Sequence, residues 1–382
     1  MTQQHDFSKG SVARNILYLA APMTAAQLIN VLYSVVDRMY LGRLPGHLAL
    51  TGVGLTLPVV SIIMGFANLC GTGGAPLCSI CRGRGDDEEA ERIMGNSFTL
   101  LLLFGAAVTV VFLAFQRPIL YLFGASDATY PYASAYMTIY LLGSIFVMIG
   151  LGMNPFISMQ GFGRTGMMTV GLGALVNIVL DPVFIFGLNM GVRGAALATV
   201  LAQAVSVIIS MAMICRRTLP FAFQKEDIRV DRQLIGKELK LGIPVGLQEF
   251  LVGTSFLVIQ TVVNSFGVTA SAGVGVAEKV CVFIMLVPSA YMQSMSAFVA
   301  QNIGAGLETR ARRALLYGVL SSLMAGLLMG WAAFFHGDVL AGIFADDPAV
   351  IAAAWEYLKA YAIDCLLTSF LFCFVGFFNG KS

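Results

Sequence analysis

GMMTVGLGALVNIVLDPVFIFG, residues 166–187, is a run of 22 residues with a single charged side chain, Asp181. At a rise of about 1.5 Å per residue, a helix of this length crosses the hydrocarbon core of a bilayer, which is about 30 Å thick. The run therefore predicts a membrane-spanning helix. It also raises the question of why an aspartate followed by a proline, Pro182, lies inside it.

The rest of the chain repeats this pattern. Of the 382 residues, 58% are hydrophobic and 12% are charged, whereas soluble domains have about 25% charged residues. These runs do not alternate polar and apolar residues as the strands of a membrane barrel would. We predict an all-α polytopic membrane protein with helices near residues 15–42, 49–81, 93–115, 131–160, 166–187, 194–215, 241–265, 271–302, 314–335 and 349–379.

The distribution of basic residues predicts the orientation. The first apolar run is too long for a signal peptide and has no small-residue cleavage site, so the first helix is expected to stay in the protein. With a cytoplasmic N-terminus, the outer loops hold only Arg43, Arg117 and Arg193, and the inner segments hold most other lysines and arginines. This positive-inside bias predicts a multi-pass protein of the cell membrane. No basic cluster is interleaved with aromatic residues, so we expect no nucleic-acid partner.

An internal repeat relates the two halves of the chain. One offset, 221 residues, matches eight positions, among them the pairs Gly46 and Gly267, Arg92 and Arg313, Phe123 and Phe344, and Tyr136 and Tyr357. A duplicated unit with an even number of helices gives two copies that run the same way through the membrane. We predict an N-terminal six-helix lobe (1–215), a cytoplasmic connector (216–240) and a C-terminal lobe (241–382). The second lobe has only its first four helices, so we expect a truncated chain that lacks about 55 residues.

Oxygen-bearing side chains of the first lobe share one depth. Asp37 and Asp181 each lie about 10 Å below the outer end of their helix, and Thr199 lies at a similar depth on the next helix. Asn177 precedes Asp181 by four residues, which places both on one helix face. Pro182 removes a backbone donor and frees a carbonyl nearby.

These hard oxygen donors suit a proton or a small cation such as Na⁺. Ionisable residues inside a membrane usually face an interior cavity and mark an ion or proton pathway. We therefore predict a cation-coupling site of Asp37, Asn177, Asp181 and Thr199. The alternative is that Asp181 only hydrogen-bonds Asn177 or Thr199 as a packing contact. The second copy has Val258 or Ile259 where the first has Asp37, so we expect the acid site in the first lobe alone.

Other polar residues within the helices are candidates for a substrate cavity. They are Gln27, Glu249, Glu278, Lys279 and Asp364. Lys279 could instead neutralise Asp364 or Glu278 in an ion pair that holds helices together, and both roles stay open.

Several enzyme and cofactor classes have no support in the sequence. Cys78 and Cys81 form a C-x-x-C without a second ligand pair, so neither a metal site nor a redox site is expected. The stretch GFGRTG (161–166) lies between membrane helices without a preceding strand, which argues against dinucleotide binding. Neither H-E-x-x-H nor G-x-S-x-G occurs. We predict that the protein is not an enzyme and has no cofactor.

Taken together, several stretches resemble the multidrug and toxic compound extrusion (MATE) family. They are PMTAAQLINVLYSVVDRMYLGRLPG (22–46), MNPFISMQGFGRTG (153–166), NIVLDPVFIFG (177–187) followed by GVRGAALAT (191–199), FVAQNIGAGLETRARRAL (298–315) and VGFFNG (375–380). The resemblance implies two six-helix lobes around a central cavity and export of amphipathic, often cationic, drugs in exchange for Na⁺ or H⁺. It also implies that Asp37, Asn177, Asp181 and Thr199 are the cation site of the first lobe, and that the first helix can bend at Pro22.

Two features depart from the family pattern. Arg38 stands where many members have threonine, and Glu249 and Asp364 are displaced by about one turn from the acids that some members use in the second lobe. The hypothesis is a monomeric antiporter that works by alternating access on small organic substrates in the lipid bilayer. The alternatives are a lipid-linked oligosaccharide flippase of the same superfamily and a membrane-embedded enzyme that modifies lipid.

Overall fold

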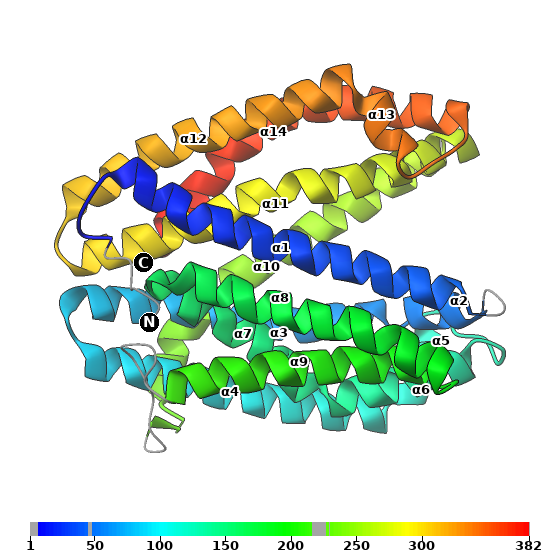
Figure 1. The fold of residues 1–382 in the computed structure, drawn as a ribbon, viewed down its shortest axis with the longest axis horizontal. Helices are drawn as coiled ribbons and strands as arrows, with labels where there is room; N and C mark the ends of the chain where they lie inside the picture. Colours follow the sequence, from blue (N-terminus) through cyan, green and yellow to red (C-terminus); the bar gives the residue numbers. More distant parts are fainter. Residues whose placement is uncertain (1–6, 45–47, 216–226, 229, 382) are drawn as a thin grey trace. The chain divides into compact units, whose positions relative to one another are not determined.

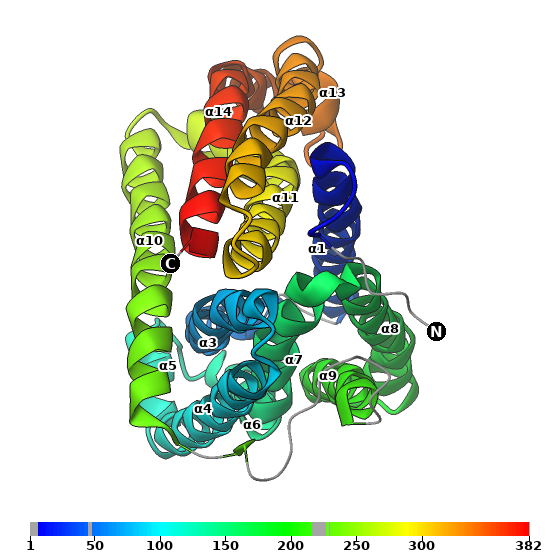
Figure 2. The same ribbon diagram turned by 90° about the vertical axis from the view of Figure 1, so that its left-hand side faces the viewer.

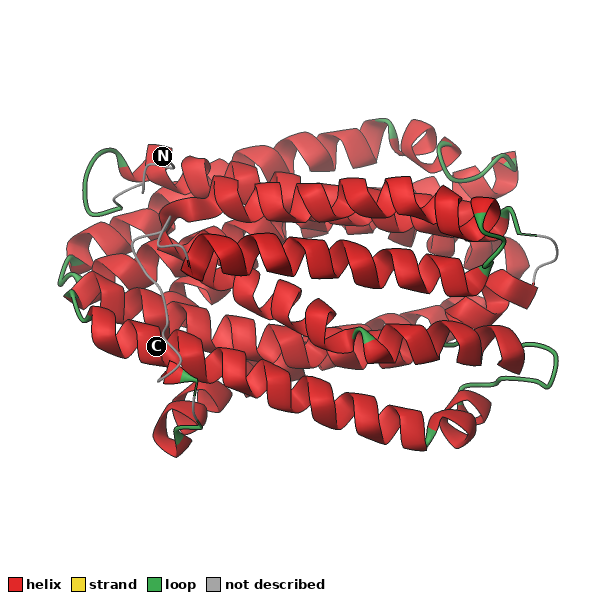
Figure 3. Ribbon diagram, turned by 60° about the horizontal axis from the view of Figure 1, so that its bottom comes forward, coloured by secondary structure: helices red, strands yellow, loops and turns green. Residues whose placement is uncertain are grey.

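The computed structural model describes residues 7–44, 48–215, 227, 228 and 230–381 (Figure 1). Within this part of the chain every regular element is a helix, and loops connect the helices without any strand (Figure 3). The predicted all-α membrane fold is confirmed. Sixteen helical segments follow one another: α1 (Val12–Gly42), α2 (Leu48–Gly54), α3 (Leu57–Arg84), α4 (Asp87–Ala114), α5 (Gln116–Leu122), α6 (Tyr130–Leu142), α7 (Ser144–Ile157), η1 (Ser158–Phe162), α8 (Gly163–Pro182), η2 (Val183–Gly187), α9 (Val192–Cys215), α10 (Arg232–Asn264), α11 (Val268–Gly304), α12 (Glu308–Phe335), α13 (Gly337–Gly342) and α14 (Pro348–Lys381).

Nine helices of the described residues are long and apolar enough to cross a membrane, where the sequence predicts ten. The difference lies in residues 144–187, which count as one continuous span although the backbone breaks inside it. Gly161 has φ 95° and ψ 5°, a conformation that glycine adopts readily and other residues avoid. The chain therefore turns between α7 and α8 at the predicted loop, and the fourth and fifth runs are separate elements.

Two compact units make up the chain, and they divide inside helices rather than between them. Residues 29–243 belong to the first unit, and residues 6–28 with 244–382 belong to the second. The predicted lobes followed sequence order, with a boundary in the connector 216–240, most of which lies outside the described residues. The observed division runs through α1, between Leu28 and Ile29, and through α10, between Ile243 and Pro244.

In the first unit, the helices α3, α4, α7, α8 and α9 lie side by side. Figure 2 views them roughly along their long axes. Small residues bring these helices together, and Ala195, Ala196 and Ala198 of α9 are completely buried. Small residues at membrane helix contacts let the backbones approach closely. Large apolar side chains such as Val110 and Leu175 remain exposed on the unit, as expected of a surface that meets lipid.

In the second unit, α11, α12 and α14 pack around a core that contains Val280, Ile284 and Leu358. The N-terminal segment belongs to this unit, and Arg310 holds it there. The Arg310 guanidinium donates hydrogen bonds to the carbonyl oxygens of Phe7, Lys9 and Gly10 at 2.7–2.9 Å.

Candidate cation site

The C-terminal end of α8 supplies the centre of the candidate site. Asn177 and Asp181 lie one turn apart on one face and are 1% and 0% exposed. Asn177 Nδ2 donates a hydrogen bond to Asp181 Oδ1 at 3.3 Å. Directly after Pro182 the backbone widens into the π-helical turn η2, a form that occurs frequently at functional sites.

Helix α9 brings Thr199 to the same place. Near its start, a Cβ at Gly194 would come within 2.7 Å of the carbonyl carbon of Phe184, so only glycine allows α9 to cross η2 this closely. Thr199 lies beyond this crossing, and its Oγ1 accepts a hydrogen bond from Asn177 Nδ2 at 3.4 Å. Three of the four predicted residues therefore form one connected group.

Asp37 approaches the group from α1, in the half of that helix that belongs to the first unit. Its carboxylate is close enough to Asp181 to interact with it electrostatically. Arg38, the next residue on the helix, is exposed, forms no ion pair with Asp37 and interacts with its carboxylate electrostatically.

Three tyrosines that the sequence analysis did not assign to the site, Tyr33, Tyr136 and Tyr140, complete the surroundings. Tyr33 lies within electrostatic range of both carboxylates, as does Tyr136. The rings of Tyr136 and Tyr140 stack with centroids 5.9 Å apart. The signal was present in the spacing, because Tyr33 precedes Asp37 and Tyr136 precedes Tyr140 by four residues, which is one helical turn.

Several buried oxygens of this group lack a hydrogen-bond partner. They are Asp37 Oδ1, Asn177 Oδ1 and Asp181 Oδ2. A buried polar atom without a partner is costly, and a carboxylate more so. The donor set of two carboxylates, an amide and a hydroxyl fits a proton or a hard cation such as Na⁺.

The other predicted residues lie apart from this group. Pro22 and Gln27 are half-buried in the part of α1 that belongs to the second unit, and Gln27 Nε2 donates to Ser289 Oγ at 3.3 Å. Glu278 and Asp364 are half-buried and Lys279 is exposed, and none of them forms an ion pair among the described residues. Glu249 lies in α10, and its side chain is outside the part that the structure describes.

Cys78 and Cys81 are buried among the packed helices. Cys78 is buried, and Gln160 Nε2 donates to its sulfur at 3.3 Å. No group of three or more histidine, cysteine, aspartate or glutamate side chains with metal-binding geometry occurs in the described chain.

Comparison with known proteins decides the family. The model of a family described as MatE matches residues 22–183 and 244–382, which is most of the chain. This chain belongs to the MatE family. The predicted family is confirmed, and with it the prediction that the protein is a transporter of a membrane-spanning family and not an enzyme.

Named relatives agree with this assignment. The MatE chain is 25% identical over 370 residues to the multidrug export protein MepA of Staphylococcus haemolyticus, covering 97% of this chain and 82% of the relative. It is also 25% identical over 374 residues to MepA of Staphylococcus aureus strain NCTC 8325, covering 98% and 83%. A crystal structure of a MATE protein in complex with MaL6 superposes with a TM-score of 0.93 at 22% identity, covering all of this chain and 86% of the other, and shows the common fold.

Proposed function

We propose that this MatE protein is a cation-coupled antiporter that exports small amphipathic organic compounds, often cationic, from the cell. The family and the names of the relatives, multidrug export proteins, support the export of organic compounds. The coupling cation is H⁺ or Na⁺. Asp37, Asn177, Asp181 and Thr199 are its ligands in this proposal.

The observation that carries the proposal is the buried set of oxygens without partners in the first unit. Two carboxylates that share a buried site repel each other unless a cation or a proton lies between them. No basic side chain of the described residues forms an ion pair with either acid, and the nearby Arg38 is exposed and acts on Asp37 without such a contact. A cation that reaches the site would supply the missing partner to all three orphan oxygens.

Asn177 would transmit the arrival of the cation to the helices. Its amide links Asp181 on α8 to Thr199 on α9 through one nitrogen. When its oxygen and the carboxylates turn toward a cation, these two hydrogen bonds must lengthen or rearrange. A ligand shifts a conformational equilibrium only as far as it binds one state better than the other. In this proposal the rearranged hydrogen bonds of Asn177 make the difference in cation affinity between the two states.

Helices α1 and α10 each have residues in both units, so a change in one unit can move the other through them. Pro22 interrupts the hydrogen-bond ladder of α1 upstream of Leu28, where that helix leaves the second unit. We propose that α1 bends near Pro22 when the cation site is occupied, so that access alternates between the two membrane faces. Gln27, Glu278 and Asp364 are the proposed polar contacts for the organic substrate, and the N-terminus is cytoplasmic in the cell membrane.

The test is drug transport by the protein in reconstituted vesicles, with sodium and pH gradients imposed separately. Asp181→Asn removes one negative ligand at constant size, and export driven by the coupling gradient should fall to background. Asp338→Asn is the matched control, because it makes the same change in an exposed acid of the second unit that has no proposed role in transport. Unchanged driven export by Asp181→Asn would remove the site from the mechanism.

A further inference from the structure

A second buried acid lies far along the chain from the candidate cation site, in the first turns of α10. This part of α10, residues 232–243, belongs to the first unit and packs against α3 and α4. The contact with α3 is backbone to backbone. A Cβ at Gly242 would come within 2.5 Å of the Leu69 carbonyl oxygen, and a Cβ at Gly73 would collide with the carbonyl oxygen of Glu238.

The Glu238 side chain is completely buried at this contact. Asn96 of α4 donates from Nδ2 to Glu238 Oε1 at 3.0 Å, and Asn96 Oδ1 accepts a hydrogen bond from the backbone N–H of Asp231 at 3.0 Å. Glu238 Oε2 has no partner, and neither has the hydroxyl of Ser97, which is also buried and faces the carboxyl. The side chains that can hydrogen-bond this carboxyl group, Asn96 and Ser97, are therefore both neutral.

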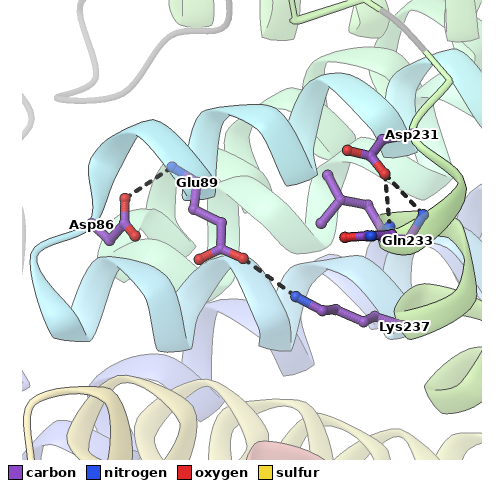
Figure 4. Close-up of polar contacts among 6 residues, drawn as sticks. Asp86, Glu89, Asp231, Gln233 and Lys237 are labelled. Carbon is purple, nitrogen blue, oxygen red and sulfur yellow. Dashed lines mark hydrogen bonds and ion pairs between the residues drawn. The ribbon is translucent and has the colours of Figure 1, made fainter.

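The charges near Glu238 are engaged with other groups. Lys237 is exposed and pairs with Glu89 at 3.4 Å, and Asp86 caps the start of α4 through the backbone N–H of Glu89 (Figure 4). Asp231 accepts from the backbone N–H groups of Gln233 and Leu234 at the start of α10, at 2.8 and 3.3 Å.

On the remaining sides of Glu238 no positive charge is available. Lys240 and Arg232 are exposed. The titratable group that faces Glu238 from α3 is the buried thiol of Cys70, and the α4 side chains that face it, Asn96 and Ser97, are uncharged. Among the described residues no cation compensates this carboxyl group.

We propose that Glu238 is a proton-binding site, and that its bound proton holds the start of α10 against the first unit. A neutral carboxyl group accepts from Asn96 on one oxygen and has an O–H on the other, for which Ser97 Oγ is an acceptor within the same contact. An ionised carboxyl group would be a buried charge with only the neutral donors Asn96 and Ser97 and no cation, so its exposure to water would be strongly favoured. Release of the proton therefore loosens residues 232–243 of the helix that continues past Pro244 into the second unit.

The first experiment asks whether the proton is present. Infrared difference spectra of the full chain in lipid nanodiscs at pH 7 would compare the wild type with Glu238→Gln. Gln keeps the size and a neutral donor and acceptor, so the variant should fold. We expect the wild type to have a protonated-carboxyl carbonyl band, shifted in D₂O, that Glu238→Gln lacks and that the neighbouring control Glu89→Gln keeps. Absence of a band assigned to Glu238 overturns the proposal.

The second experiment measures how often the start of α10 opens, and its main readout is the wild-type protein. Amide hydrogen exchange of residues 232–243 is followed from pH 6 to 9 and corrected for intrinsic exchange. Opening that releases one proton should become up to about tenfold more frequent per pH unit. Residues 308–335 in α12 should show no such slope, and neither should residues 232–243 of Glu238→Gln. A wild-type slope of zero, or an equal slope in Glu238→Gln, contradicts the proposal.

Discussion

The two units hold their acids in different ways. In the first unit Asp181 is fully buried, hydrogen-bonded to Asn177 and within range of a second carboxylate. In the second unit Glu278 and Asp364 are half-buried. The Thr368 hydroxyl donates a hydrogen bond to the backbone carbonyl of Asp364, not to its carboxylate. Both units are helical, and they differ in the surroundings of their acids.

The position that corresponds to Asp37 illustrates the difference. Val258 and Ile259 occupy this register in α10, and they are 58% and 39% exposed on their unit. An apolar side chain there needs no partner, whereas a carboxylate on a membrane helix needs several. The matched position therefore offers a carboxylate in the first copy and only an apolar side chain in the second.

The largest effect expected from this comparison is on coupled transport. Asp37→Asn removes a charged ligand from the first unit, and a hydrogen bond to a charged group contributes about 1.5–3 kcal/mol, or about 10- to 100-fold in cation affinity. Glu278→Gln neutralises a proposed substrate contact of the second unit, so it should change the dependence of uptake on substrate concentration and leave its dependence on cation concentration unchanged. The measurement is the initial rate of gradient-driven uptake into inverted vesicles as a function of cation concentration. Equal losses in both variants would end the assignment of the coupling site to one unit.

The second effect concerns folding stability. Gly194→Ala places a Cβ against the Phe184 backbone, and such overpacking destabilises by about 1–3 kcal/mol. Gly275 of α11 has open space around a Cβ, so Gly275→Ala should be neutral or should stabilise its helix by about 0.5–1 kcal/mol. Thermal unfolding in detergent measures both. A Gly194→Ala protein as stable as the wild type would show that the α9 crossing can relax.

A smaller effect on cation binding is expected for Thr199 than for the acids, and none is expected for Thr368. Thr199→Val removes the hydroxyl that meets Asn177, which should weaken cation binding by about 0.5–1.5 kcal/mol, a few-fold in the dissociation constant. The Thr368 hydroxyl bonds the Asp364 carbonyl within its own helix, so Thr368→Val should leave cation binding as it is. Isothermal titration with Na⁺ and with protons distinguishes the two variants, and a loss confined to Thr368→Val would move the site to the second unit.

The smallest effect is expected for exposed ion pairs, which occur in both units. Glu88 pairs with Arg92 at 2.8 Å, and Glu356 pairs with Lys359 at 2.6 Å. Exposed pairs contribute about 0–1 kcal/mol because water and salt screen them. Glu88→Gln and Glu356→Gln should each leave the unfolding temperature nearly unchanged. A large change for either one would mean that its helix end is less exposed in the membrane than on the isolated chain.

Much of the candidate site follows from the sequence. Helical spacing alone put Asn177 and Asp181 on one face, and counting residues from the helix ends brought Asp37 and Thr199 to their depth. The tyrosines around the carboxylates were not predicted, because tyrosine in a membrane helix is common and its hydroxyl acquires a role only from the neighbouring helix. Whether the four predicted residues bind a cation stays a prediction.

The sequence by itself determined that this protein is a membrane-spanning helical bundle, and it predicted an internal repeat and acids at one depth. Those properties depend on the length, spacing and charge of local runs, which a linear chain records directly. Only the tertiary structure decided that α1 and α10 each divide between two units, and that Glu238, near several basic residues in the sequence, is buried without a cation. Burial and partners depend on which helix faces meet, and close backbone approaches such as the one between Gly73 and Glu238 exist only once the helices are packed.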